Sequence, residues 1–217
     1  PYTVTTASIT PTAGEVGATL AVSGVPVASG AASPDINLAV GANNLTTVIT
    51  APNGVTTRSY VVAITREPWK GPFYVQPTGN NSNACDAWGA DRACQTVAGA
   101  IGKSTLQGTV IYIAPGTYTE NGLTSALSLN FVGSGAGNTL VDGNLGGRVF
   151  NLTSVTSTVT FQDLTVQRGS ISAANGAGIN AAGALSLTHV NVLSNTISGT
   201  GYFYGGGIYA GGALTLT

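Results

Sequence analysis

The stretch GAGINAAGALSLT at residues 176–188 returns as GGGIYAGGALTLT at residues 205–217, with nine identities in thirteen aligned columns. The same step along the chain leads from Phe150 to Ile179 and from Ile179 to Ile208. A second apolar ladder, with less regular steps, is predicted through Leu127, Val159, Leu185 and Leu214. Self-similarity at this period, with short alternating strands and Gly/Asn turns, indicates a solenoid. The leucine-rich repeat pattern does not recur, so we expect a right-handed parallel β-helix with coils of about 29 residues.

Upstream of these coils, residues 1–66 carry a different β pattern. Apolar and polar residues alternate across residues 36–40 and 60–64. Turn-forming residues separate such runs, as in SPD at 33–35, GANN at 41–44 and PNG at 52–54. Short strands between turns, without a helical stretch, predict a small β-sandwich of the Ig-like class.

The expected molecule is therefore all-β, with a β-sandwich at residues 1–66, a linker EPWKGP at residues 67–72 and a parallel β-helix at residues 73–217. An N-terminal cap is expected over about residues 73–108. The sequence stops inside a repeat, at GALTLT, and contains no Met. These features lead us to expect either a fragment of a longer protein or a fibre subunit that neighbouring copies complete by strand addition.

The composition narrows the classes of partner. Charged residues make up 7% of the chain and the net charge is −1, so there is no basic run to bind nucleic acid or an anionic membrane. No apolar run reaches the ~18 residues of a membrane-spanning helix. Because 43% of the residues are hydrophobic, the chain is expected to fold around a core and not to be disordered.

The two cysteines indicate an oxidising compartment. Cys85 and Cys94 lie nine positions apart in a loop rich in Gly, Asn and Asp, which suits a local disulfide; two free thiols are the alternative. A zinc site is not expected, because it needs four ligands and the one histidine, His189, is remote in sequence. The disulfide favours an exported, extracellular protein.

Both halves of the chain resemble known families. Residues 17–66, from GATLAVSG to the closing strand RSYVVAITR, resemble the bacterial cadherin-like β-sandwich domain, although members of that family usually have a further strand before the position of Tyr2. Residues 73–217, with GTVIYIAPGTYTENGL and LSLNFVGSGAGNTLVDG, resemble the pectin-lyase-like β-helix of bacterial surface proteins of the polymorphic outer-membrane and choice-of-anchor types. This second resemblance implies that CQTVAGAI at 94–101 is a capping helix over the first coil.

The pectin-lyase resemblance raises the question of catalysis. Enzymes on that scaffold use paired acidic residues, calcium-binding carboxylates or a basic Arg or Lys. The corresponding motifs are absent, so no catalytic residue and no cofactor or metal is assigned. The candidates for a charged patch that binds saccharide or calcium are Asp142, Arg148, Asp163 and Arg168. The alternative is that these four are solvated turn charges.

An aromatic cluster is the other candidate site. Tyr202, Phe203 and Tyr204 form a run in a Gly-rich turn, and Tyr209 follows closely. Exposed aromatic residues on a solenoid turn can contact glycans or proteins; the alternative is packing over the next coil.

The sequence thus favours a structural or adhesive protein without catalysis at a bacterial cell surface, as a stalk or fibre component. Its expected partners are other copies of itself, neighbouring surface proteins and glycans. The alternative is a carbohydrate-binding or carbohydrate-active β-helix of the polysaccharide lyase type. A third possibility, ice binding, needs a regular array of Thr, and the sequence does not maintain one.

Overall fold

The structure, a computed structural model, describes residues 3–217. These residues form 22 strands and one helix, α1 (Val97–Lys103). The predicted all-β class is confirmed. The chain divides into two compact units, Pro1–Trp69 and Lys70–Thr217.

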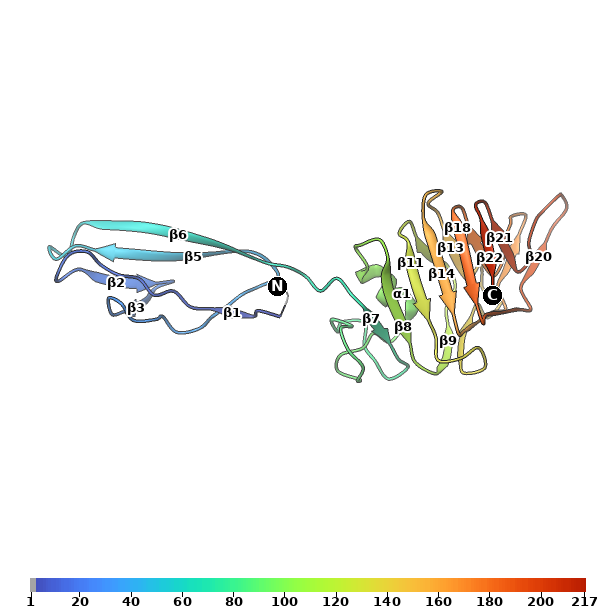
Figure 1. Ribbon diagram of the computed structural model, residues 1–217, viewed down its shortest axis with the longest axis horizontal. Helices are drawn as coiled ribbons and strands as arrows, with labels where there is room; N and C mark the ends of the chain where they lie inside the picture. The colour runs from blue at the N-terminus through green and yellow to red at the C-terminus, as the bar shows by residue number, and fades with distance from the viewer. Residues whose placement is uncertain (1–2) are drawn as a thin grey trace. The chain divides into compact units, whose positions relative to one another are not determined.

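The first unit is a sandwich of two antiparallel sheets (Figure 1). The larger sheet has the strand order β3-β2-β5-β6 and the smaller one consists of β1 and β4. The strands are β1 (Thr6–Ala7), β2 (Thr19–Val22), β3 (Val25–Val27), β4 (Ile36–Asn37), β5 (Gly41–Thr50) and β6 (Thr57–Arg66). Between the two sheets lie four aliphatic side chains that are at most 5% exposed, namely Leu20, Val22, Leu38 and Leu45.

The turn predicted at residues 41–44 is wrong, whereas the one at residues 52–54 joins β5 to β6 as expected. Gly41–Asn44 are the first residues of β5 and pair with the end of β6. Asn43 explains the difference, because its side-chain amide donates to Ala39 O and its Oδ1 accepts from Ala39 N, both at 2.9 Å. The asparagine therefore closes the bend that precedes it, and its own backbone remains in the strand.

The second unit is a β-solenoid of about four turns, whose strands form three main parallel sheets. Figure 1 shows the coils stacked in chain order. The first sheet contains β7 (Phe73–Val75), β8 (Thr109–Ile113), β11 (Leu129–Val132), β14 (Thr158–Gln162), β18 (Ala184–Thr188) and β22 (Leu214–Leu216). The second contains β9 (Gly116–Thr119), β12 (Thr139–Asp142), β15 (Thr165–Gln167) and β19 (Asn191–Leu193). The third contains β10 (Leu123–Ser125), β13 (Phe150–Leu152), β17 (Ile179–Ala181) and β21 (Ile208–Ala210), and a small sheet pairs β16 (Ser170–Ser172) with β20 (Thr196–Ser198).

The register confirms one predicted ladder and corrects the other. Phe150, Ile179 and Ile208 are consecutive partners in the third sheet, as predicted. In the first sheet the partner of Val159 is Leu129, because Asn130 pairs with Thr160; Leu127 lies before β11. The coils average about 26 residues, shorter than the repeat period predicted from the last two coils.

The coil lengths vary within one sheet. Thr109 pairs with Leu129, whereas the next coil separates Asn130 from Thr160, which is a much longer stretch of chain. The later pairs, Val159 with Leu185 and Leu185 with Leu214, have intermediate separations. The ladder itself is continuous, so the loops between strands absorb the differences in length.

The interior of the solenoid is apolar, with an aromatic centre. Phe131, Phe150 and Phe161 are at most 1% exposed, and their ring centroids lie 4.8–5.2 Å apart. Offset and edge-to-face rings at this distance add to the energy of burial. They join successive coils of the first and third sheets into one core.

Candidate functional site

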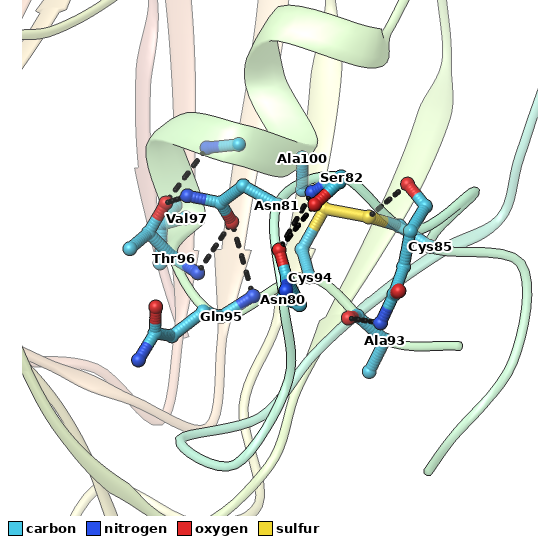
Figure 2. The surroundings of a disulfide bond; sticks show 12 residues. Asn80, Asn81, Ser82, Cys85, Ala93, Cys94, Gln95, Thr96, Val97 and Ala100 are labelled. Carbon is cyan, nitrogen blue, oxygen red and sulfur yellow. Dashed lines mark hydrogen bonds between the residues drawn. A yellow bond between two sulfur atoms is a disulfide. The ribbon is translucent and has the colours of Figure 1, made fainter. Parts of the chain in front are cut away.

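The N-terminal cap of the solenoid is held by a disulfide between Cys85 and Cys94, as predicted. Their Cα atoms are 4.9 Å apart and both residues are fully buried. The loop that carries them runs along β7, where Tyr74 N donates to Cys85 O and Cys94 N donates to Tyr74 O. Figure 2 shows the bridge beside the start of α1. The disulfide therefore fixes the loop against the first strand of the solenoid.

The capping helix begins three residues later than the predicted segment 94–101. Thr96 is its N-cap, and Thr96 Oγ1 accepts from Gly99 N at 3.0 Å. Asn81 Oδ1 accepts from the backbone N–H groups of Gln95 and Thr96, as Figure 2 shows. These amides are committed to the loop, so the helical turn starts at Val97.

Glu120 ties the same helix to the next coil. Its two carboxylate oxygens accept from Val97 N at 2.7 Å and Ala98 N at 2.8 Å. Burial raises the pKa of Glu120, although the two backbone donors oppose the shift. Burial also raises the pKa of the neighbouring Tyr118 phenol, and the charge of Glu120 adds to that rise. Both groups are used structurally, because Tyr118 donates to the carbonyls of Val75 and Ala114.

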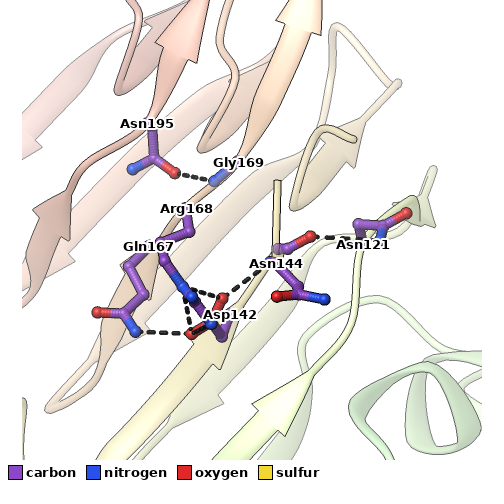
Figure 3. Close-up of polar contacts among 8 residues, drawn as sticks. Asn121, Asp142, Asn144, Gln167, Arg168, Gly169 and Asn195 are labelled. Atoms are coloured by element: carbon purple, nitrogen blue, oxygen red, sulfur yellow. Dashed lines mark hydrogen bonds and ion pairs between the residues drawn. The ribbon is translucent and has the colours of Figure 1, made fainter. Parts of the chain in front are cut away.

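Two of the four charged candidates meet at one corner of the solenoid. Arg168 Nη2 lies 2.7 Å from Asp142 Oδ2, and Gln167 Nε2 donates to the same oxygen at 2.8 Å (Figure 3). Asn144 N donates to Asp142 Oδ1 at 2.8 Å. Burial alone would raise the pKa of Asp142, but the hydrogen bonds from Arg168, Gln167 and Asn144, with the charge of Arg168, lower it below its usual range. The carboxylate is 2% exposed and satisfied from within the chain, which describes a structural ion pair.

The other two candidates contact different residues. Arg148 donates from Nε to Gly176 O and from Nη2 to Asn175 O, at 2.9 and 2.7 Å. Asp163 Oδ1 lies 3.2 Å from His189 Nδ1. In stacked coils a side chain contacts residues of the next coil. Asp142 therefore pairs with Arg168 and Asp163 with His189, each one coil later. Neither Arg148 nor Asp163 makes an ion pair or hydrogen bond with Asp142 or Arg168, so the structure supplies one ion pair and two separate contacts among these four residues.

The aromatic run is exposed at its ends and packed in its middle. Tyr202 is 94% and Tyr204 65% exposed, whereas Phe203 is half-buried over Gly201. Tyr204 N donates to Asn175 Oδ1 at 2.8 Å, which fastens this loop to the preceding coil. Tyr209 is half-buried in β21 beside Asn180, so it does not belong to the exposed pair.

A second aromatic cluster, which was not predicted from the sequence, covers the outer face of β7 and β8. The ring of Tyr74 stacks on Tyr112 with centroids 5.5 Å apart and meets the edge of Trp88 at 4.8 Å. Trp88 is 47% and Tyr112 36% exposed. Tyr74 and Tyr112 are register partners, although the whole cap lies between them in the sequence. The repeat period therefore could not bring them together.

Polar groups flank this second cluster on the first sheet. Thr160 Oγ1 donates to Asn130 Oδ1 at 2.7 Å, which forms an outward-facing ladder on adjacent strands. A hollow of about 390 Å³ lies beside Tyr112 and includes Gln107, Thr109 and Val110 in its lining. Flat rings beside hydrogen-bonding groups are suited to binding a polar ligand with apolar faces.

The described residues, 3–217, contain no group of three His, Cys, Asp or Glu side chains placed to hold a metal ion. Within the same range, no helix has the length and apolar character needed to cross a membrane.

The fold and these surfaces define a two-part all-β protein, a cadherin-like sandwich with a β-solenoid. The family model described as "Cadherin-like beta sandwich domain" matches residues 1–67, which is the first unit. Comparison with curated proteins and comparison with solved structures each found no match.

Proposed function

We propose that the protein is an extracellular structural or adhesive component of a bacterial cell surface, without catalytic activity. A cadherin-like domain joined to a β-solenoid fits a surface or adhesive protein. The observation that carries the proposal is the loop of Tyr202 and Tyr204, two solvent-exposed aromatic side chains on a loop that the hydrogen bond from Tyr204 N to Asn175 Oδ1 fastens to the preceding coil. Exposed aromatics of this kind supply contact area at small loss of side-chain entropy.

The finer assignment is that the solenoid is of the pectin-lyase-like type found in polymorphic outer-membrane and choice-of-anchor surface proteins. It rests on the sequence resemblance together with the parallel three-sheet coils. The proposed partners are neighbouring surface proteins, other copies of the chain joined by strand addition, and glycans.

The test is a bead-adhesion assay. Beads coated with the 217-residue chain are expected to attach to a cell or protein surface, and Tyr202→Ala with Tyr204→Ala should reduce attachment severalfold. Val155→Ala is the matched control, because Val155 is 77% exposed in another loop of the same solenoid. Equal attachment of all three proteins would contradict a contact role for the aromatic loop.

A carbohydrate-binding solenoid is the second candidate, and the cluster of Trp88, Tyr74 and Tyr112 favours it. Titration with soluble polysaccharides should change the fluorescence of Trp88 in a Trp69→Phe background, which leaves Trp88 as the single tryptophan. Release of reducing ends or unsaturated uronides from the same polysaccharides would contradict the proposed lack of catalysis.

A further inference from the structure

The last strand of the sandwich, β6, is an unprotected sheet edge. It pairs with β5 through ten consecutive residues without a bulge, and within residues 3–217 no strand pairs with its other side (Figure 1). The opposite edge of the same sheet, β3, is only three residues long and contains Pro26. Natural sheets shield edges with short strands, prolines, bulges or inward charges, and β6 has none of these along its centre.

The hydrogen-bond alternation shows which backbone groups of β6 face away from β5. Ala51 N donates to Thr56 O, so residue 56 belongs to a hydrogen-bonded pair. On the far side of β5, Ser23 N donates to Thr46 O, so Thr46 points to β2 and away from its β6 partner, Val61. Antiparallel pairs alternate. The outward backbone groups of β6 therefore belong to Thr57, Ser59, Val61, Ala63 and Thr65.

The side chains of β6 leave an apolar strip uncovered on both faces. Tyr60 and Val62 lie beside the buried Thr47 and Leu45, on the core side of the sheet, yet they are 52% and 44% exposed. Val61, on the other face, is 59% exposed. Only four aliphatic side chains are well buried among residues 3–69, so this unit gains buried apolar area when a neighbouring strand packs its side chains beside the strip.

We infer that β6 is the site at which two copies of the chain associate, by antiparallel pairing of β6 with β6 of a second copy across a two-fold axis at Val61. In this register the position numbers of each pair sum to 122, so all five outward residues find outward partners. The hydrogen-bonded pairs are Thr57 with Thr65, Ser59 with Ala63, and Val61 with Val61. Each such pair exchanges two bonds, so the ribbon gains up to about ten.

The side chains fit the same register. Tyr60 lies opposite Val62 of the second copy, an aromatic and β-branched pair of the kind that stabilises sheets. The two charged residues of β6 also avoid each other, since Arg58 lies opposite Ile64 and Arg66 opposite Thr56 of the second copy. A strand with no like charges opposed is compatible with itself as partner. The antiparallel arrangement also makes the residues that follow Arg66 leave the ribbon at opposite ends in the two copies.

The proposed function includes association of copies of the chain by strand addition. The pairing of β6 with β6 specifies the strand and the register of that association, and it rests on this part of the proposed function alone. Adhesion by the solenoid is tested separately by the bead assay.

The full chain, whose mass is 21.5 kDa, should sediment as a dimer of two such chains, and monomer should appear on dilution. Val61→Lys places two like charges opposite each other at the axis and should give monomer. Val55→Lys adds the same charge at a residue that is 82% exposed in the hairpin turn, outside the ribbon, and should leave the dimer intact.

Cysteine cross-linking tests the register independently of dimer strength. In the inferred pairing, the Cα atoms of two Val61→Cys copies are about 5.5 Å apart, within disulfide range. Those of two Ser59→Cys copies are separated by about 13 Å along the strand. Mild oxidation should therefore join Val61→Cys into a covalent dimer and leave Ser59→Cys unlinked. The inference would be refuted by a parent chain that stays monomeric at every concentration and whose Val61→Cys variant does not cross-link. It would also be refuted by a dimer that Val61→Lys and Val55→Lys weaken equally, or by cross-linking of the Ser59→Cys variant.

Discussion

At the scale of single residues, the solenoid depends on side chains and glycines at its corners. Asp163, Arg168, His189 and Ser194 all have φ between 50° and 54° and follow strands of the first or second sheet. The repeated GxGI stretches begin with Gly176 and Gly205, where φ is +63° and +64°. In this left-handed region a side chain is strained. At Gly176 and Gly205 a Cβ would in addition meet backbone atoms, so glycine is the residue that fits there.

The first prediction concerns Gly176. A Cβ at this position would meet Ile179 O and Asn180 Cα, which are backbone atoms of the next strand and cannot rotate away. We therefore expect Gly176→Ala to lower the free energy of unfolding by more than about 1 kcal/mol, as measured by urea denaturation. Gly137→Ala is the control, because Gly137 has open space around its Cα and no positive φ. Equal stability of the two variants would contradict this account of the repeat.

The second prediction concerns Asp142. Asp142→Asn replaces a carboxylate that accepts from Arg168 and Gln167 by an amide whose N–H₂ opposes one of these donors. At neutral pH the substitution should lower the free energy of unfolding by about 1–3 kcal/mol. Asp91→Asn is the control: it changes an exposed carboxylate of the same unit and should leave the free energy of unfolding unchanged.

The same pair of proteins gives a pH dependence of defined sign. Because the folded-state pKa of Asp142 is lowered, its contribution to stability is complete above the ordinary aspartate pKa of about 3.9 and is lost as the pH falls through the folded value. The difference in urea midpoint between the parent and Asp142→Asn should therefore narrow below about pH 4. The raised pKa of Glu120 acts in the opposite direction, but it is common to both proteins and cancels. A difference that stays constant down to acidic pH would show that the carboxylate charge does not matter.

At the scale of elements, the cap is the part of the solenoid that its own repeat does not provide. α1 buries Val97 and Ala100, and the loop before it is closed by the Cys85–Cys94 disulfide and bonded to β7 through the backbone of Tyr74. By covering the first coil, this segment shields strand edges that would otherwise be open to other chains.

The third prediction is that Cys85→Ser with Cys94→Ser loosens the cap. Closing a loop of this length stabilises the folded state by about 2–3 kcal/mol in the chain-entropy model, so the double variant should lose about that much. Hydrogen exchange should quicken at Tyr74 and Cys94, whose amides bond along this loop, and should stay unchanged in β18. Faster exchange throughout the solenoid would mean that the cap and the coils unfold as one unit.

Strands that belong to the repeated stretch were predictable from the sequence. Strand boundaries that depend on the hydrogen bonds of one side chain were not. The ladder through Phe150, Ile179 and Ile208 follows from the repeated stretch, and the disulfide from the spacing of its cysteines. Leu127 was wrongly placed in the other ladder because the coil that links β11 to β14 is longer than the coil before it. The turn at 41–44 was wrong because the amide of Asn43 makes a bend at Ala39 that no composition rule anticipates.

The candidate site was less predictable than the fold. Tyr202 and Tyr204 are exposed, but no recognisable motif accompanies them, so the sequence names no ligand for them. The cluster of Tyr74, Trp88 and Tyr112 was missed because its members belong to the cap and to the first coils, where the repeat has not begun.

At the scale of the whole molecule, the two units reach stability by different routes. The sandwich has few buried side chains and a long open edge, while the solenoid buries side chains continuously from Phe73 to Leu187. Each solenoid strand pairs only with the coils before and after it, so its stability grows as a sum over neighbouring coils.

The unequal coil lengths have a consequence for how such a chain can evolve. The short coil that joins Thr109 to Leu129 and the long one that joins Asn130 to Thr160 stack in the same sheet without a break in pairing. An insertion or deletion in a loop between strands therefore changes the surface and leaves each strand with its partner. The loop at 199–205 is attached to the coil before it by Tyr204 N and Asn175, so it can be lengthened, shortened or exchanged while this contact is kept. Relatives of this protein would then be expected to differ in the length and exposed side chains of their loops, on strands whose spacing does not change.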